Sequence, residues 1–131
     1  MDLLKTYTDS RGCLTIAEVG REVPFEVQRI YWIYQVPEDK SRGMHANKIS
    51  YQYLIAVHGT VEICLENAQE RKHYLLDSPD KGLLVPPLTW NELLKFSDDA
   101  VLLVMASHPY EPETYINSYE VFQKIVHPVA E

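Results

Sequence analysis

The sequence predicts an all-β protein, an antiparallel barrel or sandwich of the jelly-roll type with one short helix near its C-terminus. Stretches rich in β-branched and aromatic residues recur along the chain, and turn-forming residues separate them about every eight to twelve residues. The 9 tyrosines and 8 prolines also favour short strands and turns. The 131 residues fit one domain, residues 1–131, which is large enough to bury a core without disulfide bonds.

Three strands are expected in the first part of the chain. The turn signal Asp-Ser-Arg-Gly at residues 9–12 precedes a strand over residues 13–17. After a loop that ends at Pro24, residues 25–34 are rich in β-branched and aromatic side chains and predict a second strand. A polar loop then leads into residues 41–48, which we interpret as a third strand.

A β-hairpin is the prediction for the middle of the chain. Residues 53–57 form an uninterrupted apolar run, which is typical of a strand buried on both faces. Gly59 follows as a turn residue, and residues 61–66 then alternate between apolar and polar side chains. We therefore expect these two segments to pair with each other.

The remaining elements are three strands and the terminal helix. Residues 71–76, 83–85 and 100–105 predict strands, and the double proline at residues 86–87 excludes a central ladder position there. The helix is expected over residues about 112–125, because a proline and an acidic residue in the first turn favour a helix start.

Charge and composition restrict the classes of partner. The net charge of −7 argues against broad binding to nucleic acid, although it permits a local arginine pocket for one small anion. Cys13 and Cys64 fall in no metal-binding or redox spacing, so we interpret both as ordinary thiols. The N-terminus lacks an apolar signal core and no apolar run reaches transmembrane length, so we expect a cytoplasmic protein without a membrane partner.

The central stretch carries a spaced set of polar residues. The spacing of His45, Asn47, Gln52 and Gly59 reproduces His-x-His, four residues, Glu, six residues, Gly, the first metal-binding pattern of cupins. Asn91 is the candidate for the fourth cupin position, on a later segment. Amides are weak ligands for transition metals, so we expect a cupin barrel without a metal. A purely structural role for His45, capping or filling the barrel, fits the pattern equally well.

A second group of candidates lies on the expected strand 25–34. Arg29, Tyr31 and Ile33 would share one face of that strand. If this face is inside the barrel, it places a cation and a phenol beside His45; an exposed Arg29 and a merely packed Tyr31 are equally consistent with the sequence. One imidazole with phenols and amides suits proton transfer next to a carbonyl, and arginines suit a pyrophosphate. This chemistry requires no cofactor.

Many short blocks, in order from about residue 5 to residue 122, resemble one family, the sugar-nucleotide 3,4-ketoisomerases of the WxcM-like cupin group. The blocks are Asp9-Ser10-Arg11-Gly12, Pro24-Phe25, Arg29-Ile30-Tyr31, Arg42-Gly43-Met44-His45-Ala46, Leu76-Asp77-Ser78-Pro79, Gly82-Leu83, Trp90 with Glu92, Phe96-Ser97 and Ala106-Ser107. The resemblance implies an RmlC-like cupin jelly roll and a homodimer. It also implies isomerisation of dTDP-4-keto-6-deoxyglucose through an enediol, for 3-amino-3,6-dideoxy sugars of surface polysaccharides.

The resemblance also implies roles for individual residues. The catalytic candidates are His45, Tyr31 and Asn47, and the substrate-binding candidates are Arg29, Arg42, Asn91, Gln52 and Trp90. The family motif usually reads His-Ala-His, and the later tryptophan is often followed by histidine.

This chain departs from the family motifs at two places, Asn47 and Asn91. Amides orient a substrate but do not exchange protons usefully near neutral pH. A non-catalytic sugar-nucleotide-binding cupin, or a catalytically impaired variant, therefore stays open as the alternative, whereas a metal-dependent cupin is disfavoured. The apolar strands around Trp32 and Tyr51 either supply a dimer interface or cover the barrel's own second face.

Overall fold

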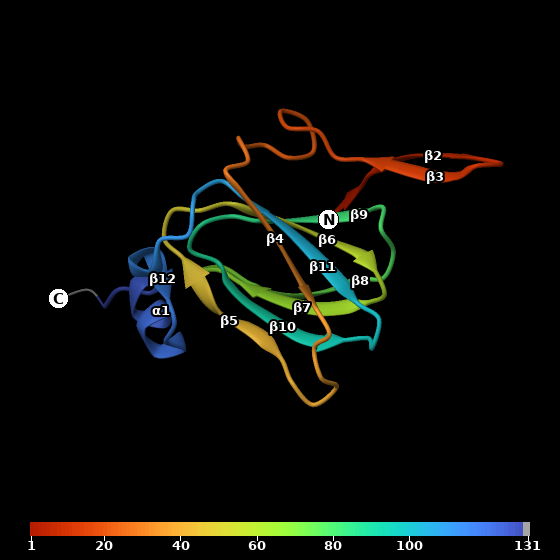
Figure 1. Ribbon diagram of the computed structural model, residues 1–131. Helices are drawn as coiled ribbons and strands as arrows, with labels where there is room; N and C mark the ends of the chain where they lie inside the picture. The colour runs from red at the N-terminus through yellow and green to blue at the C-terminus, as the bar shows by residue number, and fades with distance from the viewer. Residues whose placement is uncertain (130–131) are drawn as a thin grey trace.

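Two five-stranded antiparallel sheets face each other in the computed structural model, which describes residues 1–129 (Figure 1). The first sheet has the order β1 (Asp2–Leu3), β9 (Lys81–Val85), β6 (Gln52–His58), β11 (Val101–Ala106) and β4 (Arg29–Tyr34). The second has the order β12 (Tyr115–Ile116), β5 (Arg42–Asn47), β10 (Trp90–Phe96), β7 (Val61–Glu66) and β8 (Arg71–Leu76). The antiparallel jelly-roll prediction is confirmed.

The expected hairpin of residues 53–57 and 61–66 is wrong. β6 pairs with β9 and β11, whereas β7 pairs with β8 and β10, so the two strands belong to different sheets. The turn at Gly59, where φ is +69°, takes the chain from one sheet to the other. A Cβ atom there would lie 2.7 Å from the Cα atom of Ala100, so the crossing also requires a residue without a side chain.

The main hydrophobic core fills the space between the sheets. Leu54 and Ala56 of β6 and Leu102 of the neighbouring strand β11 lie in the first sheet and pack in one cluster with Ile63 of β7 in the second sheet; all four are buried. The other face of β6 is also covered, because Tyr53 and Ile55 pack in a second cluster that includes Leu4, Val23, Phe25 and Val27. The predicted two-sided burial of the run is thus confirmed for residues 53–56.

Strand β4 begins at Arg29, four residues later than expected, because residues 25–28 instead run over the outer face of the first sheet. Within β4 the predicted alternation is confirmed. Arg29, Tyr31 and Ile33 are half-buried on the inner face, and the intervening apolar side chains are exposed on the outer face. β4 is an edge strand of the first sheet, so its inner face borders the open side of the barrel.

The terminal helix α1 (Tyr119–Val126) is shorter than the expected helix over residues 112–125. The side chain of Ser118 accepts a hydrogen bond from the backbone N–H of Val121, so the helix begins there. The proline that suggested an earlier start opens a 3-10 turn, η1 (Pro112–Thr114), and β12 follows as an edge strand on β5. No helix among residues 1–129 combines the length and apolarity needed to span a bilayer.

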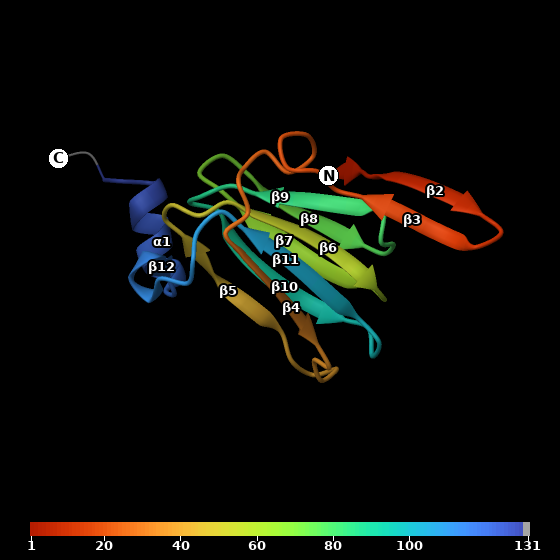
Figure 2. The same cartoon turned by 45° about the horizontal axis from the view of Figure 1, so that its top comes forward.

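A separate hairpin of β2 (Lys5–Asp9) and β3 (Gly12–Ile16) projects beyond the barrel (Figure 2). The predicted turn at residues 9–12 is confirmed at its tip, where Gly12 has φ +118°. The sequence did not suggest β2, whose residues are all exposed. A strand without a buried face has no apolar alternation by which to recognise it.

Candidate active site

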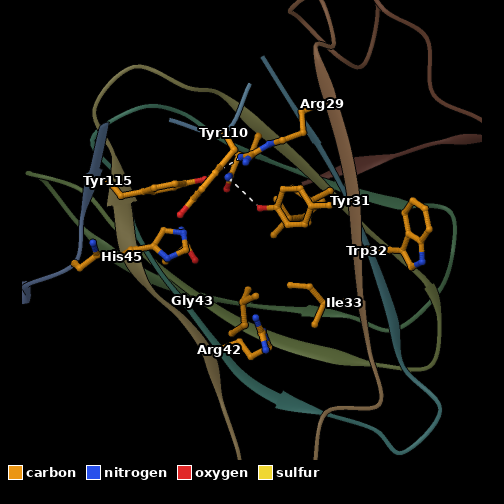
Figure 3. Close-up of a pocket in the computed structure, with 15 residues that line it drawn as sticks. Arg29, Tyr31, Trp32, Ile33, Arg42, Gly43, His45, Tyr110 and Tyr115 are labelled. Atoms are coloured by element: carbon orange, nitrogen blue, oxygen red, sulfur yellow. Dashed lines mark hydrogen bonds between the residues drawn. The ribbon is translucent and has the colours of Figure 1, made fainter. Parts of the chain in front are cut away.

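A cavity of about 460 Å³ opens between β4 on one side and β5, β10 and β12 on the other. Both sheets and the C-terminal segment contribute polar side chains to its wall, namely Arg29, Tyr31, Arg42, His45, Gln52, Asn91, Tyr110, Tyr115 and Asn117. Figure 3 shows His45 and Tyr115 on one side of this space and Tyr31 on the other. The cavity is therefore the place where the candidate residues of distant segments meet.

A β-bulge in β5 directs His45 into the cavity. Asn91 of β10 pairs with His45 and the next residue, Glu92, pairs with Gly43, so Met44 is the additional residue on β5. The backbone is left-handed at both Gly43 (φ +80°) and Met44 (φ +60°). A Cβ atom on Gly43 would lie 2.6 Å from Oδ1 of Asn91, so glycine is the residue that lets the two strands approach here.

The imidazole of His45 has the environment of a neutral base. Burial lowers the pKa of His45 below its ordinary value; a backbone hydrogen bond at Gly43 opposes this shift, and the positive charge of Arg29 adds to it. The ring meets that of Tyr115 edge-on, with 5.0 Å between the ring centroids. His45 is therefore uncharged at neutral pH and able to accept a proton from a substrate.

Arg29 is a cation without a carboxylate partner among residues 1–129. Its Nη2 donates to the hydroxyl of Tyr115 at 2.8 Å, and its guanidinium lies over the rings of Tyr31 and Tyr110, 5.0 and 5.5 Å from their centroids. Its Nε is buried and has no hydrogen-bond partner within residues 1–129. No carboxylate lines the described cavity, and Arg42 adds a second cation at its exposed rim. These two guanidinium groups suit an anionic ligand such as a phosphate.

Tyr31 supplies a phenol that stays protonated. Its hydroxyl accepts a hydrogen bond from Nε2 of Gln52 at 3.2 Å. Burial raises the pKa of Tyr31 to about 12; Tyr115 adds to the rise, whereas Arg29 and the bond from Gln52 oppose it. The Tyr31 hydroxyl can therefore donate a proton or a hydrogen bond to an oxygen in the cavity.

The structure places Asn47 and Trp90 outside the cavity wall. The Asn47 amide is hydrogen-bonded at both ends: its oxygen accepts from backbone N–H groups, and its nitrogen donates to Thr114. The ring of Trp90 packs against Tyr119 and Phe122, and its Nε1 donates to Glu92. The other six candidates from the sequence, Arg29, Tyr31, Arg42, His45, Gln52 and Asn91, converge on the cavity.

The described part of the chain offers few side chains that could coordinate a metal ion together. Residues 1–129 contain no group of three or more His, Cys, Asp or Glu side chains placed to hold a metal ion. Of the cupin positions that line the cavity, His45 is the only imidazole, and Gln52 and Asn91 are amides. These donors suit hydrogen bonding to a substrate better than coordination of a transition metal.

Three polar residues of the cavity wall were not predicted as site residues from the sequence: Tyr110, Tyr115 and Asn117. Tyr115 and Asn117 fell within the expected helix over residues 112–125, and a helix there did not predict that their side chains face the barrel. Asn-Ser at residues 117–118 is a possible N-cap signal, and it would have moved the helix start past Tyr115. The pairing of Tyr115 with β5 had no local signal, because it depends on a contact distant in sequence.

The fold and the cavity together define an RmlC-like cupin, a jelly-roll barrel with acid–base side chains inside. Residues 1–127 match the family described as FdtA: WxcM-like, C-terminal. The chain is 36% identical over 122 residues to the TDP-4-oxo-6-deoxy-alpha-D-glucose-3,4-oxoisomerase of Aneurinibacillus thermoaerophilus, covering 93% of this chain and 88% of that protein. The chain therefore belongs to the FdtA, WxcM-like family.

Solved structures agree with this assignment. A 3,4-ketoisomerase from Helicobacter canadensis superposes with a TM-score of 0.89 at 39% identity, covering 94% of this chain and 92% of that one. QdtA, a sugar 3,4-ketoisomerase from Thermoanaerobacterium thermosaccharolyticum in complex with TDP, gives 0.89 at 36% identity, covering 94% and 90%. A histidine-to-asparagine variant of QdtA holds TDP-4-keto-6-deoxyglucose. With these relatives, the chain is an enzyme of the intramolecular oxidoreductase class.

Proposed function

We propose that this protein is a 3,4-ketoisomerase of dTDP-4-keto-6-deoxyglucose that works by proton transfer and needs no cofactor. The observation that carries the proposal is the convergence in one cavity of neutral His45, protonated Tyr31 and uncompensated Arg29. Relatives that act on or bind TDP sugars support the same substrate class.

The proposed reaction moves the keto group from C4 to C3 by two proton transfers. His45 removes the proton from C3 while Tyr31 donates its hydroxyl proton to the C4 oxygen, which forms an enediol. The Tyr31 phenolate then takes the proton from the hydroxyl on C3, and the His45 imidazolium returns a proton to C4. No atom is gained or lost, so the product is an isomer of the substrate.

The remaining cavity residues bind and orient the substrate in this proposal. Arg29 and Arg42 would hold the diphosphate, because an arginine fork makes charge-assisted hydrogen bonds to phosphate oxygens. Gln52 and Asn91 would orient the sugar through its hydroxyl and carbonyl oxygens. The family resemblance links the product to 3-amino-3,6-dideoxy sugars of surface polysaccharides, and a cytoplasmic location fits a substrate built on a nucleotide.

A proton NMR time course in deuterated water tests the reaction directly. Purified protein is mixed with dTDP-4-keto-6-deoxyglucose, and the signals of the C3 and C4 positions are followed. A 3-keto product, with deuterium entering from the solvent, is the expected result. A spectrum that stays unchanged at enzyme concentrations near that of the substrate would refute the isomerase proposal.

A sugar-nucleotide-binding protein without turnover is the second candidate. The amide of Asn91 favours it, since it lines the cavity at a place where the family motif often has histidine. In that case the NMR experiment would show line broadening or shifts from binding, without product. The variant Asn91→His, which places an imidazole in the cavity wall, would then separate a disabled enzyme, which regains turnover, from a binding module, which does not.

We also propose that the protein forms a homodimer. The outer face of β4 carries Ile30, Trp32 and Tyr34, which are 54%, 59% and 56% exposed. Three large apolar side chains in a row on an edge strand are characteristic of a contact surface. Light scattering coupled to size-exclusion chromatography should give twice the chain mass of 15.2 kDa, and Trp32→Glu should shift the population toward monomer. A monomeric wild-type protein would refute the dimer.

A further inference from the structure

We propose that Asn47 is a positioning residue that acts through Thr114 to hold Tyr115 between Arg29 and His45. The proposal rests on the function proposed above and deepens it. In this role Asn47 neither accepts nor donates a proton in the reaction. The position of Tyr115 in the cavity wall therefore depends on the Asn47 amide.

Both ends of the Asn47 amide are occupied. Oδ1 accepts hydrogen bonds from the backbone N–H groups of Ile49, at 2.9 Å, and Ser50, at 2.7 Å. Nδ2 donates to Oγ1 of Thr114 at 3.1 Å. The residue is only 9% exposed. An amide has the acceptor and the donor that these three bonds need, whereas a carboxylate has no donor for Thr114.

Thr114 connects this amide to the strand that carries Tyr115. Its Oγ1 donates to the carbonyl of Glu111 at 2.7 Å, and its own carbonyl accepts from the N–H of Lys48 at 2.9 Å. The next residue, Tyr115, is the register partner of Asn47 in a strand of 2 residues. Because so short a strand has few ladder bonds, the side-chain bond from Asn47 is a substantial part of what holds it.

Tyr115 in turn contacts two of the proposed functional groups. Its hydroxyl accepts from Nη2 of Arg29 at 2.8 Å, and its ring lies edge-on to His45, 5.0 Å away between centroids. Figure 3 shows its ring reaching from β12 toward the Arg29 side chain, beside the His45 ring. If β12 shifted, Arg29 would lose its only side-chain hydrogen bond within the described residues.

Asn47 therefore influences the cavity without belonging to its wall. Loss of the amide should displace Tyr115, and with it the guanidinium that would hold the diphosphate. A displacement of about 1 Å near reacting groups costs on the order of a hundredfold in rate. Since position 47 does not open to the cavity, Asn47→His should not raise turnover above that of the wild type.

The test is a double-mutant cycle between positions 47 and 115. Turnover of the TDP sugar and affinity for TDP are measured for Asn47→Ala, Tyr115→Phe and the double variant. If Asn47 acts through Tyr115, each single variant lowers kcat by about tenfold or more. The double variant then has a kcat no lower than that of the less active single variant. Losses that multiply, in both readouts, would overturn the proposal.

A second pair of variants covers the case in which Asn47→Ala fails to fold. Thr114→Val removes the hydroxyl while leaving the bonds of Asn47 to Ile49 and Ser50 in place, so it should reproduce the loss of kcat. Thr114→Ser restores the hydroxyl and should return kcat to within about twofold of wild type. Failure of that rescue would also overturn the proposal.

Ser118→Ala serves as the matched control for general loosening of the C-terminal segment. It removes the N-cap of α1 and so loosens the start of the helix, yet it leaves the bond between Asn47 and Thr114 intact. Its kcat should equal that of the wild type; a loss equal to that of Thr114→Val would overturn the proposal. An inactive wild-type protein refutes only the proposed function, because the cycle in TDP affinity still decides the role of Asn47.

Discussion

Two arginines of this protein have opposite surroundings. Arg71, on β8, donates from Nη1 to Glu66 at 2.8 Å and from Nη2 to Glu92 at 2.7 Å. Arg29, on β4, has no carboxylate partner among residues 1–129, and its one side-chain hydrogen bond there is to a tyrosine hydroxyl. Arginine side chains as a class carry a positive charge at ordinary pH. The difference shows which charge is satisfied by the fold and which one remains available for a ligand.

The paired arginine belongs to a structural network beneath helix α1. Glu66, its partner, also accepts hydrogen bonds from the hydroxyl of Tyr119 and from Gln123, both on the helix. This network fastens the helix to the second sheet. The unpaired arginine instead borders an open cavity, where a buried charge is costly unless a ligand or solvent compensates it. The contrast supports the proposal that the cavity binds an anion.

The largest predicted effect is the loss of turnover when His45, the proposed general base, is replaced. His45→Ala should lower turnover by about 10²- to 10⁴-fold, the usual contribution of a general base, while TDP affinity stays within about threefold. Turnover by NMR and TDP binding by calorimetry measure the two quantities. His73→Ala, at an exposed position of β8, is the control and should keep full turnover. Retained turnover in the His45 variant would exclude His45 as the base.

Exchanging each arginine for glutamine tests the comparison itself. Arg29→Gln should weaken TDP binding about tenfold to a hundredfold, since a charge-assisted hydrogen bond contributes about 1.5–3 kcal/mol, and should leave stability nearly unchanged. Arg71→Gln should do the reverse, lowering the free energy of unfolding by about 1–2 kcal/mol because Glu66 loses its cation. Calorimetry and urea unfolding measure the pair; equal effects on TDP binding would contradict the assignment.

A smaller effect is expected from the pH dependence of stability at Glu66. Burial raises the pKa of Glu66, but the hydrogen bonds from Tyr119, Arg71 and Gln123 outweigh it and hold this pKa below its ordinary value of 4.5. The stabilisation is therefore present above pH 4.5 and is lost as the pH falls through the lower, folded-state pKa. Glu66→Gln should reduce stability at pH 7 by about 1–2 kcal/mol and flatten this acid limb.

Urea unfolding at several pH values measures the Glu66 effect, and Glu62→Gln is the control on an exposed position of the same strand. A wild-type protein whose stability stayed constant from neutral pH down through pH 4 would contradict the role given to Glu66.

The smallest predicted effect is on the pH profile of catalysis. The base must be neutral, so kcat/KM should fall with decreasing pH, with a midpoint below 6.5 because the pKa of His45 is lowered by burial and, in part, by Arg29. Arg29→Gln should move the midpoint upward toward 6.5, whereas Arg71→Gln should leave it in place. An acid limb that is identical in the two variants would show that Arg29 exerts no field on His45.

Much of the cavity could be predicted from the sequence, because strand alternation and motif spacing are local. The period of two along β4 places Arg29 and Tyr31 on one face, and the structure confirms that face as the inner one. The cupin spacing similarly selects His45 and Gln52, which both line the cavity. Side chains two apart on a strand share a face whatever the strand pairs with.

The predictions that failed all required knowledge of a distant partner. Residues 53–57 and 61–66 have the periodicity of strands, but nothing local says that the turn at Gly59 joins two sheets instead of two paired strands. Pro112 is as compatible with a 3-10 turn as with a helix start, and the choice depends on the pairing of Tyr115 with β5. Asn47 matches a ligand position by spacing, yet its amide is bound to a threonine 67 residues away.

The sequence by itself determined the fold class, the shared strand face of Arg29 and Tyr31, the cupin spacing that selects His45 and Gln52, and the family resemblance, because these follow from composition, spacing and strand period. Only the tertiary structure decided which sheet each strand joins, which aromatic residues complete the cavity, and that Arg71 meets two carboxylates whereas Arg29 meets none in the described part of the chain. These properties depend on contacts between residues far apart in sequence. Such contacts are selected by the packing of the whole chain around one core, and no short window of sequence contains them.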